Sequence, residues 1–320
     1  MGFDVVTFGE TMGSIRAAGL LRHGGAMSMS LGGAETNVAI GLARLGHSVR
    51  WGGRLGSDDV GAFALRTLRS EGVDTATVTL DPARATGLLL IERRVADISR
   101  GAYYRANSAG SAVAVSDVDG SFDASTRVLH LTGITPALSP SAAEATLWAA
   151  RRARELGVLV SLDVNYRAAL WARDAAVVTL RRLAALADVV FASDDELAMV
   201  APGSHVDSHG NEQAAVHALL DAGAQQVVVT RGGDGASAWT VDETAVCPAR
   251  EVRVVDTIGA GDAFTAGYLS ALLDGLPLAD RLDRGAVLGA FAVSASGDWE
   301  SLPRRDELDL IDHVAGATIR

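Results

Sequence analysis

The chain has 320 residues, of which 48% are hydrophobic and 21% charged, so it can bury a sizeable core and wholesale disorder is excluded. Its formal net charge of -11 argues against a nucleic-acid partner, because binding to the phosphate backbone needs a basic surface. The single cysteine, Cys247, excludes an internal disulfide framework and is expected to be a small apolar filler. Neither a basic N-terminal cluster nor a run of roughly eighteen apolar residues occurs, so we expect a cytoplasmic protein with no membrane contact.

All 28 basic residues are arginine, because the chain contains no lysine. This excludes the phosphate-loop signature that ends in Gly-Lys-Ser or Gly-Lys-Thr, the strand lysine of protein kinases, and Schiff-base chemistry. A protein of this sequence that handles nucleoside triphosphates must therefore do so without a lysine.

Short apolar runs alternate with amphipathic segments along the chain. The segments expected to be strands are 5–9, 128–131, 158–162, 189–191 and 227–229, and those expected to be helices are 37–45, 59–72, 142–156, 177–187 and 213–222. Alternation at this spacing predicts an α/β fold with a mostly parallel sheet flanked by helices on both faces.

Two inserts, at roughly 12–32 and 84–115, depart from this alternation. The second contains two strand-like runs, 87–91 and 101–105, joined by a charged turn with no helix between them. We expect the inserts to pair into a small β-sheet lid over the C-terminal edge of the main sheet, where open α/β sheets bind their ligands. The whole chain, 1–320, is then a single domain with the lid inserted in its main body.

The strongest chemical signal follows a strand-like run at 254–256. A turn of small residues contains Gly259, Ala260 and Gly261 and leads through Asp262 into an apolar helix that ends near residue 273. Glycines let the backbone approach a ligand closely, and a helix N-terminus favours negative charge, so the turn predicts a site for phosphate or a developing oxyanion. Asp262 could instead only cap the helix, a role worth about 1 kcal/mol.

This turn and the residues around it resemble a known family signature. The stretch 256–264, Asp-Thr-Ile-Gly-Ala-Gly-Asp-Ala-Phe, resembles the C-terminal signature of the ribokinase-like (PfkB) carbohydrate kinases. Residues 52–61 resemble a second signature of that family, and 32–39 resemble its sugar-site glycine pair. The resemblance runs from residue 5 to about 303 and implies a ribokinase-like α/β fold with a small β-sheet lid.

The resemblance also implies roles for individual residues. Asp262 would be the general base that takes the proton from a sugar hydroxyl as it attacks the γ-phosphate of ATP, with Gly259, Ala260 and Gly261 as the anion hole. Backbone amides and Mg²⁺ can supply this without lysine. The implied nucleotide-site residues are Ser193, Glu196, Thr230, Gly232, Gly233, Gly235, Gly259, Gly261 and Ala286.

Three details qualify this nucleotide site. Glu196 is expected to organise Mg²⁺ through water. Ser193 and Ala286 stand where many members of the family have asparagine, a departure that indicates the subfamily, and the glycine loop 232–235 could also be an ordinary hairpin turn. Asp256 and Thr257, with segment 294–297, are implied to bind a monovalent cation such as K⁺.

Substrate choice depends on another set of residues. Two arginines in one cavity would suit a carboxylate, which a guanidinium binds in a bidentate fork. The runs 32–35, 103–105 and 163–167 resemble 2-keto-3-deoxygluconate kinases, which implies phosphorylation of 2-dehydro-3-deoxy-D-gluconate on its terminal hydroxyl. The implied substrate-site residues are Gly33, Asn37, Tyr103, Arg105, Ile134, Asp163, Asn165, Arg167 and Asp262.

Several alternatives stay open. Arg167 could pair with a surface acid, Tyr103 could be core filler, and the same class of enzyme could act on a neutral sugar, as a fructokinase does. A reading from another class is a non-catalytic sugar-binding regulator. A dinucleotide oxidoreductase fits poorly because residues 9–13 lack the Gly-x-Gly-x-x-Gly fingerprint, and His130 is expected to be a core histidine rather than a ligand. Sheets of this kind often pair between subunits, so a homodimer through the lid is a further expectation.

Overall fold

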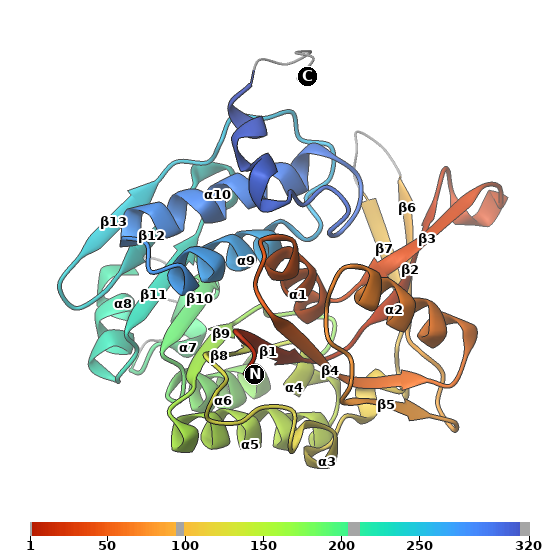
Figure 1. Ribbon diagram of the computed structural model, residues 1–320, viewed down its shortest axis with the longest axis horizontal. Helices are drawn as coiled ribbons and strands as arrows, with labels where there is room; N and C mark the ends of the chain where they lie inside the picture. The colour runs from red at the N-terminus through yellow and green to blue at the C-terminus, as the bar shows by residue number, and fades with distance from the viewer. Residues whose placement is uncertain (1, 94–98, 204–211, 314–320) are drawn as a thin grey trace.

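The structure is a computed structural model, and it describes residues 2–93, 99–203 and 212–313. Within these residues a main sheet has the strand order β13-β12-β11-β10-β9-β8-β1-β4-β5 (Figure 1). The strands from β11 to β5 are parallel, whereas β12 and β13 are antiparallel additions at one edge. The bounds are β1 (Val5–Phe8), β4 (Val49–Gly56), β5 (Val78–Asp81), β8 (Val128–Thr132), β9 (Leu159–Asp163), β10 (Val189–Ser193), β11 (Gln226–Thr230), β12 (Ala236–Trp239) and β13 (Thr244–Cys247).

Helices cover both faces of this sheet, as the alternation predicted. One face carries α1 (Ala34–Arg44), α2 (Asp59–Ser70), α9 (Ala260–Leu273) and α10 (Leu278–Ser294). The other carries α3 (Val115–Val118), α5 (Pro140–Leu156), α6 (Arg173–Ala184), α7 (Leu197–Val200) and α8 (Glu212–Asp221), while the short α4 (Thr135–Leu138) follows β8. Four 3-10 helices lie in the connections of the described chain: η1 (Leu21–His23), η2 (Gly110–Ala112), η3 (Gly232–Asp234) and η4 (Arg305–Asp312).

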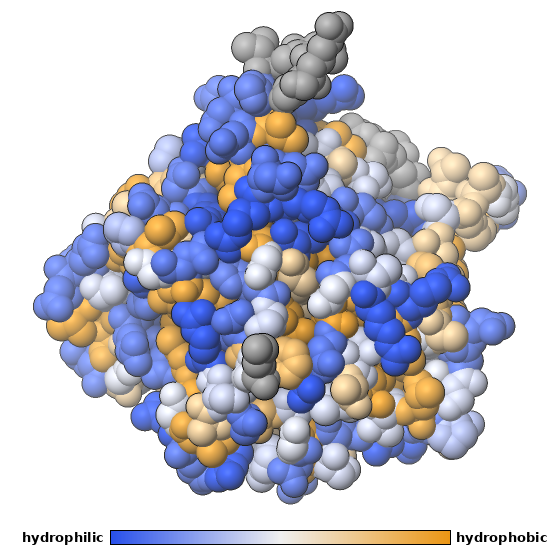
Figure 2. Space-filling model, in the orientation of Figure 1, coloured by the Kyte–Doolittle hydropathy of each residue, from blue (hydrophilic) through white to orange (hydrophobic). Residues whose placement is uncertain are grey.

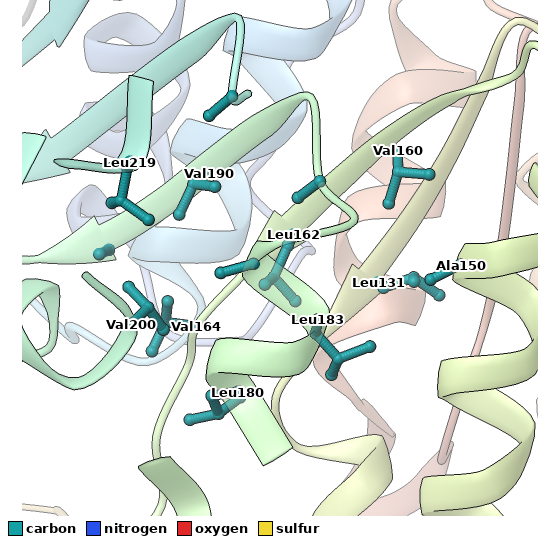
Figure 3. Packing of buried hydrophobic residues seen from close by; sticks show 14 of the residues in the cluster. Leu131, Ala150, Val160, Leu162, Val164, Leu180, Leu183, Val190, Val200 and Leu219 are labelled. Atoms are coloured by element: carbon teal, nitrogen blue, oxygen red, sulfur yellow. The ribbon is translucent and has the colours of Figure 1, made fainter. Parts of the chain in front are cut away.

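The core consists of two apolar layers because successive strand residues point to opposite faces. In β10, Val190 packs in the layer beneath α5 and α6, whereas Val189 and Phe191 pack in the layer beneath α9 and α10. Figure 3 shows Leu162 and Val190 of the sheet in the first of these layers, with Leu162 near Leu183 of α6. The apolar runs that looked like buried strands are therefore covered on both sides.

The two inserts form a separate sheet, called here the small sheet, in the order β3-β2-β6-β7. Its strands are β2 (Met12–Ala17), β3 (Met27–Gly32), β6 (Leu88–Arg93) and β7 (Ser99–Tyr104). The pairing of the inserts is confirmed, and Figure 1 shows the small sheet projecting from one side of the main body. The charged turn expected between its last two strands includes residues 94–98, which lie outside the described residues.

The strand expected at 254–256 is wrong. These residues form an irregular segment in which Val254 is exposed, and the N–H groups of Val255 and Asp256 both donate to the carbonyl of Val293 at the end of α10. Because these backbone N–H groups already have a partner at the end of a helix, the segment joins no sheet. Helix α1 also begins at Ala34, three positions earlier than the expected residue 37.

The view in Figure 2 shows hydrophilic residues spread over one face of the molecule, with smaller hydrophobic areas between them. The projecting end of the small sheet is pale and weakly hydrophobic in this view, and Met27 and Met29 of β3 are exposed there. No helix within the described residues is long and apolar enough to cross a membrane.

Candidate active site

A cleft runs along the C-terminal ends of the parallel strands. Glu10 follows β1, and Thr132, Asp163, Ser193 and Thr230 are the last residues of β8, β9, β10 and β11. The cleft has three connected parts, called here the inner, middle and outer chambers. The inner and middle chambers share Asp262, and the middle and outer chambers share Thr230 and Gly261. This is the edge at which the sequence predicted ligand binding.

Asp262 lies in the first turn of α9, where two asparagines hold its carboxylate. Asn37 Nδ2 donates to Oδ2 at 2.7 Å, and Asn165 Nδ2 approaches Oδ1 at 3.3 Å. Burial raises the pKa of Asp262, while Asn37, Arg167 and Asn165 each lower it. A buried carboxylate with an elevated pKa and a fixed orientation has the properties of a general base.

The turn before Asp262 has its shape because of Gly259, which adopts a left-handed φ of 79°. A Cβ at this position would lie 2.3 Å from the carbonyl oxygen of Asp298, so no side chain fits there. The Ala260 N–H donates to the Thr257 carbonyl at 3.4 Å, and no acceptor within the described residues takes the N–H groups of Gly261 and Asp262. These free donors at a helix N-terminus form an anion site.

The inner chamber contains both predicted arginines. Arg105 stacks over the Tyr103 ring at 4.5 Å, and its Nη1 pairs with Glu10 Oε2 at 3.1 Å. Arg167 enters no ion pair among the described residues, and its Nη1 reaches only the Tyr166 carbonyl at 3.4 Å. The chamber therefore presents one cation that is paired with Glu10 and one that makes no ion pair, although it lies near enough to lower the pKa of Asp262. Tyr103 is half exposed, so it is not core filler.

The wall between α1 and β8 completes this chamber. A Cβ on Gly33 would lie 2.4 Å from the Glu10 carbonyl oxygen, which explains the glycine there. Glu35 is fully buried, and its Oε1 accepts hydrogen bonds of 2.6 Å from the hydroxyls of Thr132 and Thr135. Burial raises the pKa of Glu35 to about 7. The predicted residues Asn37 and Ile134 also line the inner chamber.

The middle chamber brings together the predicted Asp163, Asn165, Ser193 and Glu196. Asn165 has a positive φ of 39° and donates from Nδ2 to Asp163 Oδ2 at 2.9 Å. Burial and the neighbouring carboxylates of Glu196 and Asp262 raise the pKa of Asp163 well above its usual range. Glu196 accepts the N–H of Tyr166 at 2.6 Å and that of Ser193 at 3.0 Å, so it ties the loops after β9 and β10 together.

The outer chamber lies between the loop after β11, segment 249–254 and one side of α10. Its lining is mostly small and apolar, with Thr230 and Thr257 at one end. That end adjoins the turn formed by residues 256–261, called here the anion turn. Gly235 has a positive φ of 90°, and a Cβ at this position would lie 2.2 Å from the Cys247 carbonyl oxygen, so only glycine fits there. The loop 232–235 connects the antiparallel strands β11 and β12, so it is a hairpin connection. It also forms a wall of the outer chamber. The lining residues predicted for the nucleotide are Thr230, Gly232, Gly233, Gly235, Gly261 and Ala286.

Asp256 and Thr257 lie at the start of the anion turn, but they are not arranged alike. Asp256 Oδ2 pairs with Arg16 Nη1 at 2.6 Å, and Oδ1 accepts the Ile258 N–H at 3.2 Å. Thr257 faces the cleft. Within the described part of the chain, no group of three or more His, Cys, Asp or Glu side chains could hold a metal ion.

Comparison with known proteins agrees with this geometry. Residues 3–305 match the model described as pfkB family carbohydrate kinase. The chain belongs to this family.

Among the proteins similar to this kinase, a 2-dehydro-3-deoxygluconokinase of Bacillus subtilis (strain 168) is 37% identical over 96% of the chain and 95% of that protein. A 2-dehydro-3-deoxygluconokinase of Thermoproteus tenax is 33% identical over 96% of the chain and 93% of that protein. A PfkB protein from Polaromonas sp. JS666, known from its crystal structure, is 35% identical in sequence. Its structure matches this one with a TM-score of 0.84, over 96% of this chain and 99% of the Polaromonas chain. The ribokinase-like fold predicted from the sequence is therefore confirmed.

Sequence reasoning missed Glu10, Glu35 and Asp298 of this kinase, which line the inner chamber, and Arg16, which pairs with Asp298. Glu10 and Glu35 fall within the stretches 9–13 and 32–35, which predicted no role for either, yet both carboxylates are buried beside the inner chamber. The position of Glu10 directly after the first strand was a usable signal, because functional residues gather at strand ends. Nothing in the sequence pattern pointed to Arg16 or Asp298. His130 is a core histidine as expected, since it is fully buried and its Nδ1 lies 3.1 Å from the Ser161 hydroxyl, but its Nε2 has no hydrogen-bond partner among the described residues.

Proposed function

We propose that this protein is an ATP-dependent kinase that phosphorylates the terminal hydroxyl of 2-dehydro-3-deoxy-D-gluconate, giving the 6-phosphate. The observation that carries the substrate is the pair Arg105 and Arg167 in the inner chamber, beside Asp262. A free guanidinium suits the carboxylate of a sugar acid, whereas a neutral sugar needs no such group. Two relatives that bear the name 2-dehydro-3-deoxygluconokinase support the same substrate.

In this proposal Asp262 is the general base. Its carboxylate accepts the proton of the sugar hydroxyl while the hydroxyl oxygen bonds to the γ-phosphorus and the bond from that phosphorus to the β,γ-bridging oxygen breaks. Asn37 and Asn165 orient the carboxylate, and their hydrogen bonds lower its pKa against the effect of burial. The free N–H groups at the start of α9 stabilise negative charge on the phosphoryl group as it is transferred.

The outer chamber suits a nucleotide. Its apolar walls can take a purine base, and its inner end opens onto the free amides of the anion turn. ATP bound there supplies the phosphoryl group, and Mg²⁺ supplies positive charge against its phosphates. Ser193 and Glu196 would approach the metal from the middle chamber. Glu196, whose two oxygens each accept a backbone N–H group, would act through water.

The small sheet would act as the lid, formed by roughly 12–32 and 84–115 within a single kinase domain. It brings Leu89, Tyr103 and Arg105 to the inner chamber, so its closure would exclude water from the transferred group. We expect little ATP hydrolysis without sugar, because an open lid leaves the site incomplete. Rapid hydrolysis without sugar would contradict this role.

The lid is also the proposed dimer contact. Strand β3 is an edge of the small sheet, and exposed edges of this kind pair readily with a second copy. Exposed Met27 and Met29 add apolar area on that strand. Light scattering coupled to gel filtration tests this, and a strictly monomeric protein at working concentration argues against it.

The substrate is tested by ADP release with Mg-ATP and each of four sugars: 2-dehydro-3-deoxygluconate, its galactonate epimer, fructose and ribose. Turnover confined to the two keto-acids supports the carboxylate site and compares the epimers directly. Turnover of fructose alone keeps the kinase and removes the sugar-acid assignment. No turnover of any sugar, with sugar binding retained, would favour a regulator on the kinase fold.

A K⁺ site at Asp256 and Thr257 remains a prediction of the family resemblance. The rate of the same reaction with and without K⁺ tests it. We expect no difference between the two rates, because Asp256 Oδ2 already pairs with Arg16 Nη1 at 2.6 Å.

A further inference from the structure

Arg16 on β2 of the small sheet reaches across to two aspartates of the main body. Its Nη1 lies 2.6 Å from Asp256 Oδ2, and its Nη2 lies 2.6 Å from Asp298 Oδ1. The Arg16 side chain is 15% exposed, and those of Asp256 and Asp298 are 4% and 5% exposed, so the three charges are largely removed from water. A charged carboxylate that is buried without a partner is costly, and a guanidinium offsets that cost.

Both aspartates adjoin the anion turn, one through the chain and one through space. Asp256 begins the turn and accepts the Ile258 N–H through its second oxygen. The backbone of Asp298 packs against Gly259, whose Cβ position would be 2.3 Å from the Asp298 carbonyl oxygen. Holding these two carboxylates therefore fixes the turn whose following N–H groups are free in the cleft.

The same guanidinium ties the turn to the small sheet. Ile258 of the turn packs against Met12, Leu89 and Ile91, which lie on β2 and β6. The Arg16 ion pairs and this apolar contact join the same two parts of the molecule. The geometry of the anion site is therefore coupled to the position of the small sheet.

We propose that Arg16 is a positioning residue that takes the place of a bound monovalent cation: its guanidinium neutralises Asp256 and Asp298 and holds the anion turn, so that phosphoryl transfer does not require K⁺. This rests on the proposed kinase function. A second cation beside Asp256 would meet the repulsion of the guanidinium already bound to that carboxylate. The positive charge is then provided by the Arg16 side chain of the small sheet and not by an ion from the solvent.

The test compares wild type with Arg16→Met, Arg16→Lys and the matched control Arg22→Met, in which an exposed arginine of the same insert is changed. Each is assayed in K⁺ and in choline at equal ionic strength. We expect wild type and Arg22→Met to have the same kcat in both salts. Arg16→Met should lose kcat on the order of 100-fold with little change in KM, because a displaced turn misplaces the reacting groups. Added K⁺ or guanidinium ion should restore part of this loss in Arg16→Met alone.

Thermal melting without substrates gives a second readout. K⁺ should raise the Tm of Arg16→Met but not that of wild type, because only the variant leaves the two carboxylates without their cation. If Arg16→Met does not fold, Arg16→Lys serves in its place, since one ammonium cannot make both contacts.

Three outcomes would overturn the proposal. One is a wild-type rate that rises several-fold with K⁺, and another is an Arg16→Met enzyme with wild-type kcat. The third is a loss of kcat that neither ion reverses, which would show a purely structural arginine. If wild type phosphorylates no sugar, the proposed function fails, but the melting comparison still tests the role of Arg16.

Discussion

Asn37 in the first turn of α1 donates a hydrogen bond of 2.7 Å to Asp262 in the first turn of α9. The two helices lie side by side on one face of the main sheet, although 225 positions separate the residues. This contact sets the direction of the carboxylate and lowers its pKa against the effect of burial. The chemistry of Asp262 thus depends on a residue near the opposite end of the chain.

Changing Asp262 to asparagine should abolish most turnover while the protein stays folded. A neutral amide cannot take the hydroxyl proton, and loss of a positioned base costs about 10²- to 10⁴-fold in kcat. The measurement is ADP release at saturating sugar and Mg-ATP, with circular dichroism to verify the fold. Asp280→Asn is a matched control, since Asp280 is an exposed first-turn aspartate of α10 and should leave kcat unchanged. An active Asp262→Asn enzyme would remove the assigned base.

Replacing Asn37 with alanine should move the acidic limb of the pH profile of kcat/KM to higher pH. The limb reports protonation of the base in the free enzyme, and removing a hydrogen bond to the carboxylate raises the pKa of Asp262. The variant therefore loses activity at a higher pH than wild type as the solution is acidified. Asn165→Ala should shift the limb in the same direction, and Gln213→Ala, at an exposed position on α8, should not shift it. An unmoved limb in both asparagine variants would show that Asp262 does not control it.

Replacing Arg105 or Arg167 with alanine should raise KM for the keto-acid while the KM for ATP stays nearly constant. A hydrogen bond to a charged group contributes about 1.5–3 kcal/mol, which corresponds to roughly 10- to 150-fold in KM. Arg167→Ala should give the larger effect, because Arg105 already shares its charge with Glu10. Arg100→Ala, which removes an exposed arginine from β7, is the control. An unchanged KM in both pocket variants would favour a neutral sugar as the substrate.

Alanine at the two glycines of the anion turn should separate folding from catalysis. At Gly259 a Cβ would be 2.3 Å from the Asp298 carbonyl and φ is left-handed, so Gly259→Ala should lower both Tm and kcat. At Gly261 a Cβ meets no atom within 4 Å, and alanine in a helix is favoured over glycine by about 1 kcal/mol. Gly261→Ala should therefore keep or raise Tm while its methyl group crowds the anion site and lowers kcat. Full activity in Gly261→Ala would argue against anion binding at the first turn of α9.

The amino-acid sequence by itself determined the layered fold, and it named many of the residues that the structure gathers at the cleft. Apolar runs such as 227–229 become strands buried on both faces because their side chains satisfy two apolar layers at once. The glycine turn before Asp262 was equally readable, since left-handed backbone and a free helix start depend on local residue types. The strand expected at 254–256 did not form, because the N–H groups of Val255 and Asp256 donate to the Val293 carbonyl at the end of α10, a partner that the local pattern does not reveal.

Only the tertiary structure decided which charges meet. Glu10 with Arg105, and Arg16 with both Asp256 and Asp298, are separated by 95, 240 and 282 positions. Local propensity and periodicity carry no information over such distances, because a carboxylate or guanidinium at the end of a strand can point to several neighbours. The partner is chosen when the small sheet packs on the anion turn and burial obliges each remaining charge to find an opposite one.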